Sequence, residues 1–332
     1  MKKILLIATG GTIASKPTSA GLAPQISSEE ILSYVPEAAA LCSITALQLF
    51  NLDSTNINYL HWQKIAQCVQ QNYDLYDGFV ITHGTDTMAY SVAALSYLIQ
   101  NSRKPIVFTG SQKSIYEKDT DARNNLLNAF IYAADDRACG VHLVFDDRVI
   151  LGTRARKTRT KSYNAFSSID YPEVAIFRDH RLIYYIEEHI TQQTPDFYTE
   201  LNPHVFVLKL IPGMDAEIIS YLQQHYDALI IESFGVGGVP CYEDERFLEA
   251  IQQFLAAGKT IVMATQVPHE GSDMEVYQVG YHLKEKYELI EAYTMTLESA
   301  LTKLMWILAQ TRDREKIRSY FYTPIQKDIL IP

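Results

Sequence analysis

The sequence has few cysteines, no long apolar run and no residue spacing typical of a metal site. Its 4 cysteines lie far apart among 332 residues, and no two of them form a C-x-x-C pair. No segment approaches the roughly 20 consecutive apolar residues that a membrane-spanning helix needs. The 9 histidines form neither an H-E-x-x-H motif nor a facial-triad spacing. These absences predict reduced structural thiols, no membrane span and no metal.

Basic residues are in the minority, and the N-terminus lacks a secretory pattern. The formal net charge of −10 repels polyphosphate, so we expect no nucleic acid partner and interpret the one basic run, residues 154–161, mainly as a solvated loop. The apolar run at residues 4–8 is shorter than the roughly 7 to 15 residues of a signal peptide. We therefore predict a soluble cytoplasmic protein.

The pattern of apolar residues predicts an α/β fold. Short β-rich apolar segments alternate in the first half of the chain with segments whose apolar residues recur every three or four positions. Because the strands are apolar on both faces, they fit a doubly wound, mostly parallel sheet with helices on both sides. The predicted strands are 3–9, 43–50, 78–82, 105–110 and 140–145, and the predicted helices are 58–73, 87–100 and 121–136.

A polar stretch divides the chain into two parts. Residues 186–203 contain two prolines and lack periodicity, and the alternation of strands and helices resumes after them. We therefore predict a larger N-terminal catalytic α/β domain at 1–187, a linker at 188–204 and a smaller C-terminal α/β domain at 205–332.

Polar residues follow four predicted strands at the point where each strand ends. These segments read TGGT at 9–12, NLDSTN at 51–56, THGTDTM at 82–88 and TGSQKS at 109–114. In open α/β sheets, ligands bind outside the carboxyl ends of the strands, so we expect these segments to converge. Hydroxyls beside carboxylates such as Asp53 suit a small, hydrogen-bonding, amphoteric ligand better than a metal or a flavin.

The first of these segments raises three alternatives. Adjacent glycines at 10 and 11 fit neither the G-x-G-x-x-G fingerprint nor the Walker spacing, which argues against a phosphate loop. A plain turn explains the two glycines but leaves Thr9 and Thr12 unexplained. A hydroxyl after two glycines has room for a planar substrate group and backbone donors nearby, which favours Thr12 as an acyl-transfer nucleophile.

A threonine nucleophile needs a base or a relay, and the chain offers one candidate set. Thr85 and Asp86 are predicted in the turn that enters a helix, where they could equally be ordinary capping residues. Lys157 follows a predicted strand and could serve as the base if its surroundings desolvate it, although a solvated lysine is the alternative. No G-x-S-x-G motif for a serine hydrolase is present.

Four segments together resemble a known family. They are ATGGTIAS, DGFVITHGTDTMAYSVAALSYLI, KPIVFTGSQ and LESALTKLMWILAQ, and they are similar to those of bacterial-type L-asparaginases, closest to the cytoplasmic type I enzymes. The resemblance covers nearly the whole chain. It implies hydrolysis of L-asparagine to L-aspartate and ammonia, no cofactor, and a homotetramer built as a dimer of dimers.

The resemblance also implies roles for particular residues. Thr12 matches the acylated nucleophile, and Thr85, Asp86 and Lys157 match a second catalytic triad. The implied substrate-binding residues are Asp53, Ser54, Thr55, Ser111 and Glu275, the last of which would approach the adjoining subunit.

The chain departs from the family pattern at three places. Leu22 stands where many members carry a tyrosine that helps to activate the nucleophile, so the Thr85 and Lys157 pair, or a tyrosine such as Tyr281 or Tyr293, would have to take its place. Gly238 replaces an asparagine that reaches into a neighbouring site. The segment TQVPHEG lacks the cysteine of allosteric type I enzymes, which argues against cooperative regulation. We expect residues 15–25 to form a lid loop.

Two further functions stay open on the sequence alone. A glutaminase-asparaginase or the amidase (D) component of a glutamyl-tRNA amidotransferase shares the two main motifs, although that component normally carries an extra N-terminal domain and the negative charge here disfavours RNA. A non-catalytic asparagine-binding protein is the alternative from another class, given the changes at Leu22 and Gly238.

Overall fold

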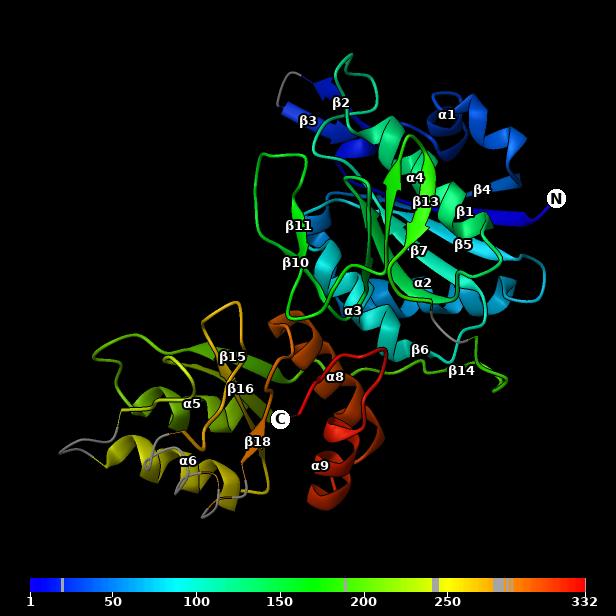
Figure 1. Ribbon diagram of the computed structural model, residues 1–332. Helices are drawn as coiled ribbons and strands as arrows, with labels where there is room; N and C mark the ends of the chain where they lie inside the picture. The colour runs from blue at the N-terminus through cyan, green and yellow to red at the C-terminus, as the bar shows by residue number, and fades with distance from the viewer. Residues whose placement is uncertain are drawn as a thin grey trace. The chain divides into compact units, whose positions relative to one another are not determined.

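The computed structural model describes residues 1–18, 21–187, 190–240, 245–276, 284, 287 and 289–331. Their contacts divide the chain into two compact units, Met1–Thr199 and Glu200–Pro332 (Figure 1). Both units combine helices with a mostly or wholly parallel sheet, which confirms the predicted fold class. The division falls inside the segment predicted as a linker at 188–204, whose boundaries stay a prediction.

An eight-stranded sheet forms the centre of the first unit. Five neighbouring strands are parallel, and three antiparallel strands extend the sheet at one edge. The order across the sheet is β13 (Arg181–Tyr184), β12 (Ala175–Arg178), β9 (Arg148–Leu151), β8 (Gly140–Phe145), β7 (Pro105–Thr109), β5 (Gly78–Thr82), β1 (Lys3–Gly10) and β4 (Ser43–Leu52).

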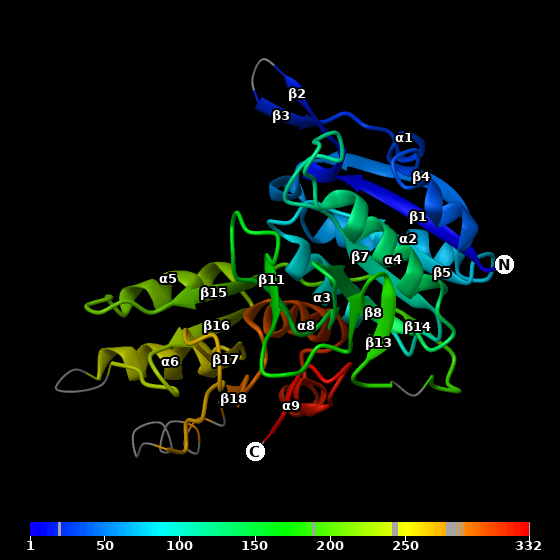
Figure 2. The same ribbon diagram turned by 45° about the horizontal axis from the view of Figure 1, so that its top comes forward.

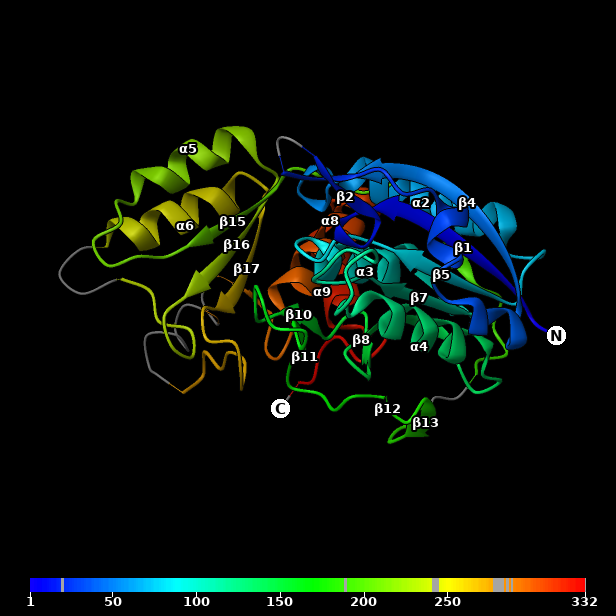
Figure 3. The same cartoon turned by 90° about the horizontal axis from the view of Figure 1, so that it is seen from above.

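Helices cover both faces of this sheet. Figure 3 shows α2 (Tyr59–Asn72) and α4 (Ala122–Ala134) on opposite sides of β1, β5 and β7. Ile4 and Leu6 of β1 pack in one apolar cluster with Leu126 and Phe130 of α4. Every residue of β5 and β7 is buried, as expected for strands covered on both faces. The remaining helices of this unit are α1 (Ser28–Leu32), α3 (Met88–Leu98), and the 3-10 turns η1 (Thr12–Ala14), η2 (Pro36–Ala40) and η3 (Ser54–Asn56).

Three short strand pairs complete the first unit. They are antiparallel and comprise β2 (Ser15–Thr18) with β3 (Gly21–Pro24), β10 (Ala155–Lys157) with β11 (Phe166–Ser168), and β6 (Ile99–Gln100) with β14 (Asp196–Phe197). Residues 15–18 and 21–24 of the segment expected as a lid loop therefore pair as strands, which extend away from the sheet in Figure 2. Its backbone pairs Pro17 with Leu22.

A smaller parallel sheet forms the second unit. Its strand order is β15 (Val205–Lys209), β16 (Ala228–Ser233), β17 (Thr260–Thr265) and β18 (Ile290–Glu291). The helices whose bounds the structure describes here are α5 (Glu217–His225), α6 (Arg246–Ala256), α8 (Leu297–Gln310) and α9 (Arg314–Tyr322). Of these, α5 and α6 lie side by side. Leu229 and Ile231 of β16 share an apolar cluster with Ile219 of α5 and Phe254 of α6.

A buried ion pair attaches the C-terminal segment to this unit. The Lys303 Nζ of α8 lies 2.7 Å from the Asp328 carboxylate, and both side chains have 0% exposure. Lys303 also donates to the Thr323 carbonyl at 2.8 Å, and Asp328 accepts the Ile325 N–H at 2.9 Å. Within the described ranges, no helix is both long and apolar enough to cross a bilayer.

Candidate active site

Two glycines bring the turn after β1 against its neighbours. Gly10 and Gly11 have positive φ angles of 102° and 81°, a region that favours glycine. A Cβ on Gly10 would lie 2.5 Å from the nitrogen of Leu52, and a Cβ on Gly11 would lie 2.3 Å from the nitrogen of Gly84. The Gly11 N–H donates to the Leu52 carbonyl at 2.9 Å. Only glycines therefore allow this turn to pack so closely on the two adjacent turns.

The other strand ends join the same site. A Cβ on Gly84 would lie 2.7 Å from the Ser54 Oγ, and the Thr87 hydroxyl donates to the Ser54 carbonyl at 2.7 Å. A Cβ on Gly110 would lie 2.2 Å from the His83 carbonyl. The structure thus brings together all four polar segments that the sequence singled out.

Thr12 begins the 3-10 turn η1 directly after the two glycines, and it is half-buried. The Ser15 hydroxyl donates back to the Gly11 carbonyl at 2.9 Å and closes this turn. Among the described residues, none makes a hydrogen bond with the Thr12 hydroxyl. The chain around Thr12 is therefore fixed, while its hydroxyl is left available to a substrate.

Lys157 links the two residues of the third segment. Its Nζ donates to the Thr85 hydroxyl at 2.8 Å and to the Asp86 carboxylate at 2.6 Å. The Lys157 side chain is 15% exposed, whereas that of Asp86 is 60% exposed. Thr85 is 5% exposed and donates to the amide oxygen of Gln112 at 3.3 Å. The exposed carboxylate of Asp86 can therefore accept a further cation without releasing Lys157.

The predicted substrate-binding residues of the first unit differ in their exposure. The Asp53 carboxylate accepts both the N–H and the hydroxyl of Thr55 at 2.8 Å, and both residues are exposed. Ser54 is 3% exposed, and Ser111 is fully buried with its hydroxyl donating to the Lys113 carbonyl. Asp53 and Thr55 are thus open to a ligand, whereas the Ser111 hydroxyl is used within its own loop.

Glu275 lies in the second unit, in a small charged cluster. Lys284 donates to Glu275 at 2.8 Å and to the Tyr293 hydroxyl at 2.9 Å, and it pairs with buried Glu291 at 2.8 Å. The hydrogen bond from Lys284 lowers the pKa of the Glu275 carboxyl. Tyr293 has a φ of 48°, which is rare for an aromatic residue. Tyr281 lies outside the described residues.

A buried histidine that the sequence interpretation missed holds the third segment. His83 has 0% exposure, and its Nδ1 donates to the Gly84 carbonyl at 2.8 Å. Since Nδ1 carries the hydrogen, Nε2 accepts from the Ser91 hydroxyl at 2.9 Å, and Ser91 accepts from the Trp62 indole at 2.8 Å. Burial lowers the pKa of His83 to about 4, so the ring is neutral. The sequence motif HGTD contains this residue, but its spacing does not indicate the hydrogen bonds from Trp62 to Ser91 and from Ser91 to His83.

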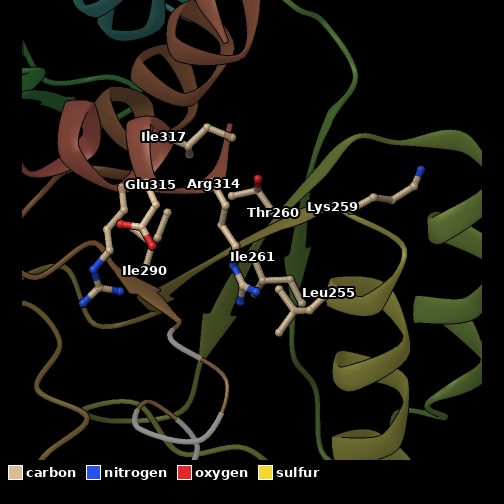
Figure 4. Close-up of a pocket in the computed structure, with 9 residues that line it drawn as sticks. Leu255, Lys259, Thr260, Ile261, Ile290, Arg314, Glu315 and Ile317 are labelled. Atoms are coloured by element: carbon tan, nitrogen blue, oxygen red, sulfur yellow. The ribbon is translucent and has the colours of Figure 1, made fainter. Parts of the chain in front are cut away.

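A small surface hollow lies in the second unit and is lined by none of these residues (Figure 4). Its lining is largely apolar, with side chains from Leu255, Ile261 and Ile290. Lys259 points away from the hollow, and Arg314 donates to the Tyr287 carbonyl at 2.8 Å. In the part of the chain that the structure describes, no three histidine, cysteine or acidic residues are grouped to hold a metal.

Comparison with known proteins identifies the family. A family model described as "Asparaginase, N-terminal" matches residues 3–189, and one described as "Glutaminase/Asparaginase C-terminal domain" matches residues 204–321. The chain belongs to the asparaginase family. This confirms the resemblance noted in the sequence and the prediction of an amide-hydrolysing enzyme.

Similar proteins cover nearly the whole of this chain. An L-asparaginase of Thermococcus kodakarensis is 38% identical over 98% of this chain and 99% of its own, and L-asparaginase 1 of Escherichia coli is 34% identical over 96% and 95%. The D component of a glutamyl-tRNA(Gln) amidotransferase of Metallosphaera sedula is 33% identical over 97% of this chain and 75% of its own.

Solved structures agree with this assignment. The thermostable L-asparaginase from Thermococcus kodakarensis superposes with a TM-score of 0.92 at 37% identity, covering 99% of this chain and 100% of that one. A probable cytoplasmic L-asparaginase from Campylobacter jejuni superposes with a TM-score of 0.83 at 25% identity, covering 97% and 99%.

Proposed function

We propose that this protein hydrolyses L-asparagine to L-aspartate and ammonia, with Thr12 as the nucleophile. The observation that carries the proposal is the packing of the Thr12 turn against the turn that holds Thr85 and Asp86, where a Cβ on Gly11 would lie 2.3 Å from the Gly84 nitrogen. Because the two turns are held against each other, their catalytic groups do not have to be brought together during the reaction. This removes part of the entropic contribution to the activation free energy.

The reaction divides into two acyl transfers. The Thr12 oxygen attacks the carboxamide carbon of asparagine and loses its proton, and the amide nitrogen takes up a proton and leaves as ammonia. The resulting aspartyl ester on Thr12 is then attacked by water, which releases L-aspartate and returns the proton to the Thr12 oxygen. Backbone N–H groups beside the glycine turn are suited to stabilise the oxyanion of each step.

Lys157, Thr85 and Asp86 form the second catalytic group in this proposal. Lys157 donates to both of the other residues, at 2.8 and 2.6 Å, so it fixes the Thr85 oxygen and the Asp86 carboxylate at one place. The Thr85 oxygen keeps a further lone pair that can accept a hydrogen bond from water or from Thr12. The exposed Asp86 carboxylate is suited to bind the α-ammonium group of the substrate.

The remaining predicted residues would bind the α-groups of asparagine. Asp53, Ser54 and Thr55 follow the strand beside Thr12, and we place Glu275 of a neighbouring subunit near them. Ser111 would take part only if its hydroxyl left the Lys113 carbonyl. That placement implies the homotetramer, a dimer of dimers, that the family resemblance suggests. A cytoplasmic location is consistent with the relative from Campylobacter jejuni whose name describes it as probably cytoplasmic.

Two routes for the Thr12 proton stay open in this proposal. One is the Thr85 and Lys157 pair: Lys157 would first lose a proton to Asp86 or to water, and the Thr85 hydrogen would then turn from Gln112 to the Lys157 nitrogen as Thr85 takes the proton of Thr12. The other is a tyrosine such as Tyr281 or Tyr293; of these two, the structure describes Tyr293, whose hydroxyl accepts a hydrogen bond from Lys284 at 2.9 Å.

The amidase component of a tRNA-dependent amidotransferase is the second candidate function. It is supported by the identity of 33% to the D component of the Metallosphaera sedula enzyme, of whose length this chain covers 75%. Its substrate amide would be glutamine, which differs from asparagine by one methylene and by about 1 to 3 kcal/mol of pocket fit.

Ammonia release from L-asparagine and L-glutamine distinguishes these functions. We expect turnover of asparagine with a kcat/KM well above that of glutamine. Faster release from glutamine would favour the amidotransferase component. Binding of asparagine by calorimetry without any ammonia release would show a binding protein and would reject the enzyme proposal.

A further inference from the structure

Gln112 connects three segments of the first unit at the candidate site. Its backbone N–H donates to both carboxylate oxygens of Asp121 at 3.1 and 2.9 Å. Its side-chain Nε2 donates to the Ser162 carbonyl at 3.1 Å, and its Oε1 accepts the Thr85 hydroxyl at 3.3 Å. Gln112 thereby links the end of β5, its own loop after β7, and the loop between β10 and β11 that follows Lys157.

The chemistry of these partners determines the direction of the Thr85 hydroxyl. The Ser162 carbonyl can only accept, so the amide nitrogen of Gln112 must face it, and the amide oxygen must face Thr85. An amide oxygen also only accepts, so the Thr85 hydrogen points at Gln112. An ammonium group can only donate, so Lys157, 2.8 Å away, uses one lone pair of the same Thr85 oxygen.

We propose that Gln112 is a positioning residue for amide hydrolysis: by accepting the Thr85 hydrogen, it leaves one Thr85 lone pair for the hydrogen bond from Lys157 and the other for a hydrogen bond from the nucleophile. Gln112 acts through Thr85 and need not touch the substrate. This inference rests on the proposed function, in which Thr85 and Lys157 assist the reaction at Thr12.

Independent contacts hold the loop that carries Ser162, so the role of Gln112 can be tested separately from loop anchoring. The Tyr163 hydroxyl donates to the Asp119 carbonyl, and the Lys113 ammonium lies 5.9 Å from the centre of the Tyr163 ring. Lys113 also pairs with the Asp119 carboxylate. Removal of the Gln112 amide therefore leaves the loop attached through Tyr163.

The test compares Gln112→Met, which keeps the side-chain length, with Tyr163→Phe, which removes only a loop anchor. For Gln112→Met we expect kcat for asparagine to fall roughly three- to tenfold, the effect of one hydrogen bond, with KM changed by less than about twofold. Tyr163→Phe should change kcat by less than about twofold. An unchanged kcat in Gln112→Met, or an equal fall in Tyr163→Phe, overturns the proposal.

Neutron diffraction from wild-type crystals tests the same inference without any turnover. We expect the deuterium of the Thr85 hydroxyl on the line to the Gln112 Oε1. A deuterium directed at Lys157 would overturn the inference even in an active enzyme. Absence of asparagine turnover in the wild type, with the deuterium as expected, would reject the proposed function and leave the hydroxyl orientation established.

Discussion

Replacing Gly11 with alanine tests how closely the turn that holds Thr12 packs on the turn that holds Thr85. Gly11 has φ 81° and ψ −178°, a conformation almost restricted to glycine, and an alanine forced into it costs about 1 to 3 kcal/mol. The new Cβ would lie 2.3 Å from the nitrogen and 2.5 Å from the Cα of Gly84. Because both atoms are backbone, relief requires the two turns to separate, which adds about 1 to 3 kcal/mol.

We therefore expect Gly11→Ala to lower the free energy of unfolding by about 2 to 6 kcal/mol in urea titrations. The matched control is Gly258→Ala, because Gly258 has a similar φ of 75° and a Cβ added there would have no atom within 4 Å. It should cost only about 1 to 2 kcal/mol. Separation of the turns should also lower kcat by about 100-fold in Gly11→Ala alone. Equal losses of stability in the two variants would refute the packing argument.

Three further perturbations have calculable outcomes. Lys303→Met leaves the Asp328 carboxylate buried without its partner and should lower the free energy of unfolding by about 3 to 5 kcal/mol, whereas replacing both residues by apolar ones should cost less. His83 has its pKa lowered from 6.5 to about 4, so the unfolded chain binds a proton that the native one does not, and about 3 kcal/mol of stability should be lost as the pH falls from 6.5 to 4. A His83→Gln variant with the same pH slope would contradict this. Lys157→Met should lower kcat by about 10² to 10⁴-fold at an unchanged melting temperature, and a wild-type kcat would remove Lys157 from the mechanism.

The sequence predicts the main strands and helices well, because the spacing of apolar residues differs between buried strands and helices. The apolar runs at 43–50 and 78–82 correspond to β4 and β5, and the helical pattern at 87–100 corresponds to α3. The antiparallel edge of the large sheet was not foreseen, since β12 and β13 have only four residues each and β13 has no fully buried residue. The hairpin of β2 and β3 was expected as a loop for a similar reason, because glycine and proline obscure a four-residue strand.

The candidate site was partly foreseeable. The carboxyl ends of parallel strands lie at the same edge of a sheet. Polar residues that follow several such strands therefore indicate where a site lies, although they do not indicate its hydrogen bonds. The relay through His83 and the links of Gln112 depend on side-chain directions and on partners up to 50 positions away, such as Ser162. Patterns among residues that are close in the sequence therefore do not predict these contacts.

The nucleophile assignment is the central claim, and Thr12→Ala tests it most directly. Asparagine binding and ammonia release are measured on the same preparation, by calorimetry and by a continuous ammonia assay. We expect kcat to fall by roughly 10³-fold or more. Asparagine should still bind, because the residues proposed to bind its α-groups are unchanged. A Thr12→Ala variant that releases ammonia at the wild-type rate would contradict the account.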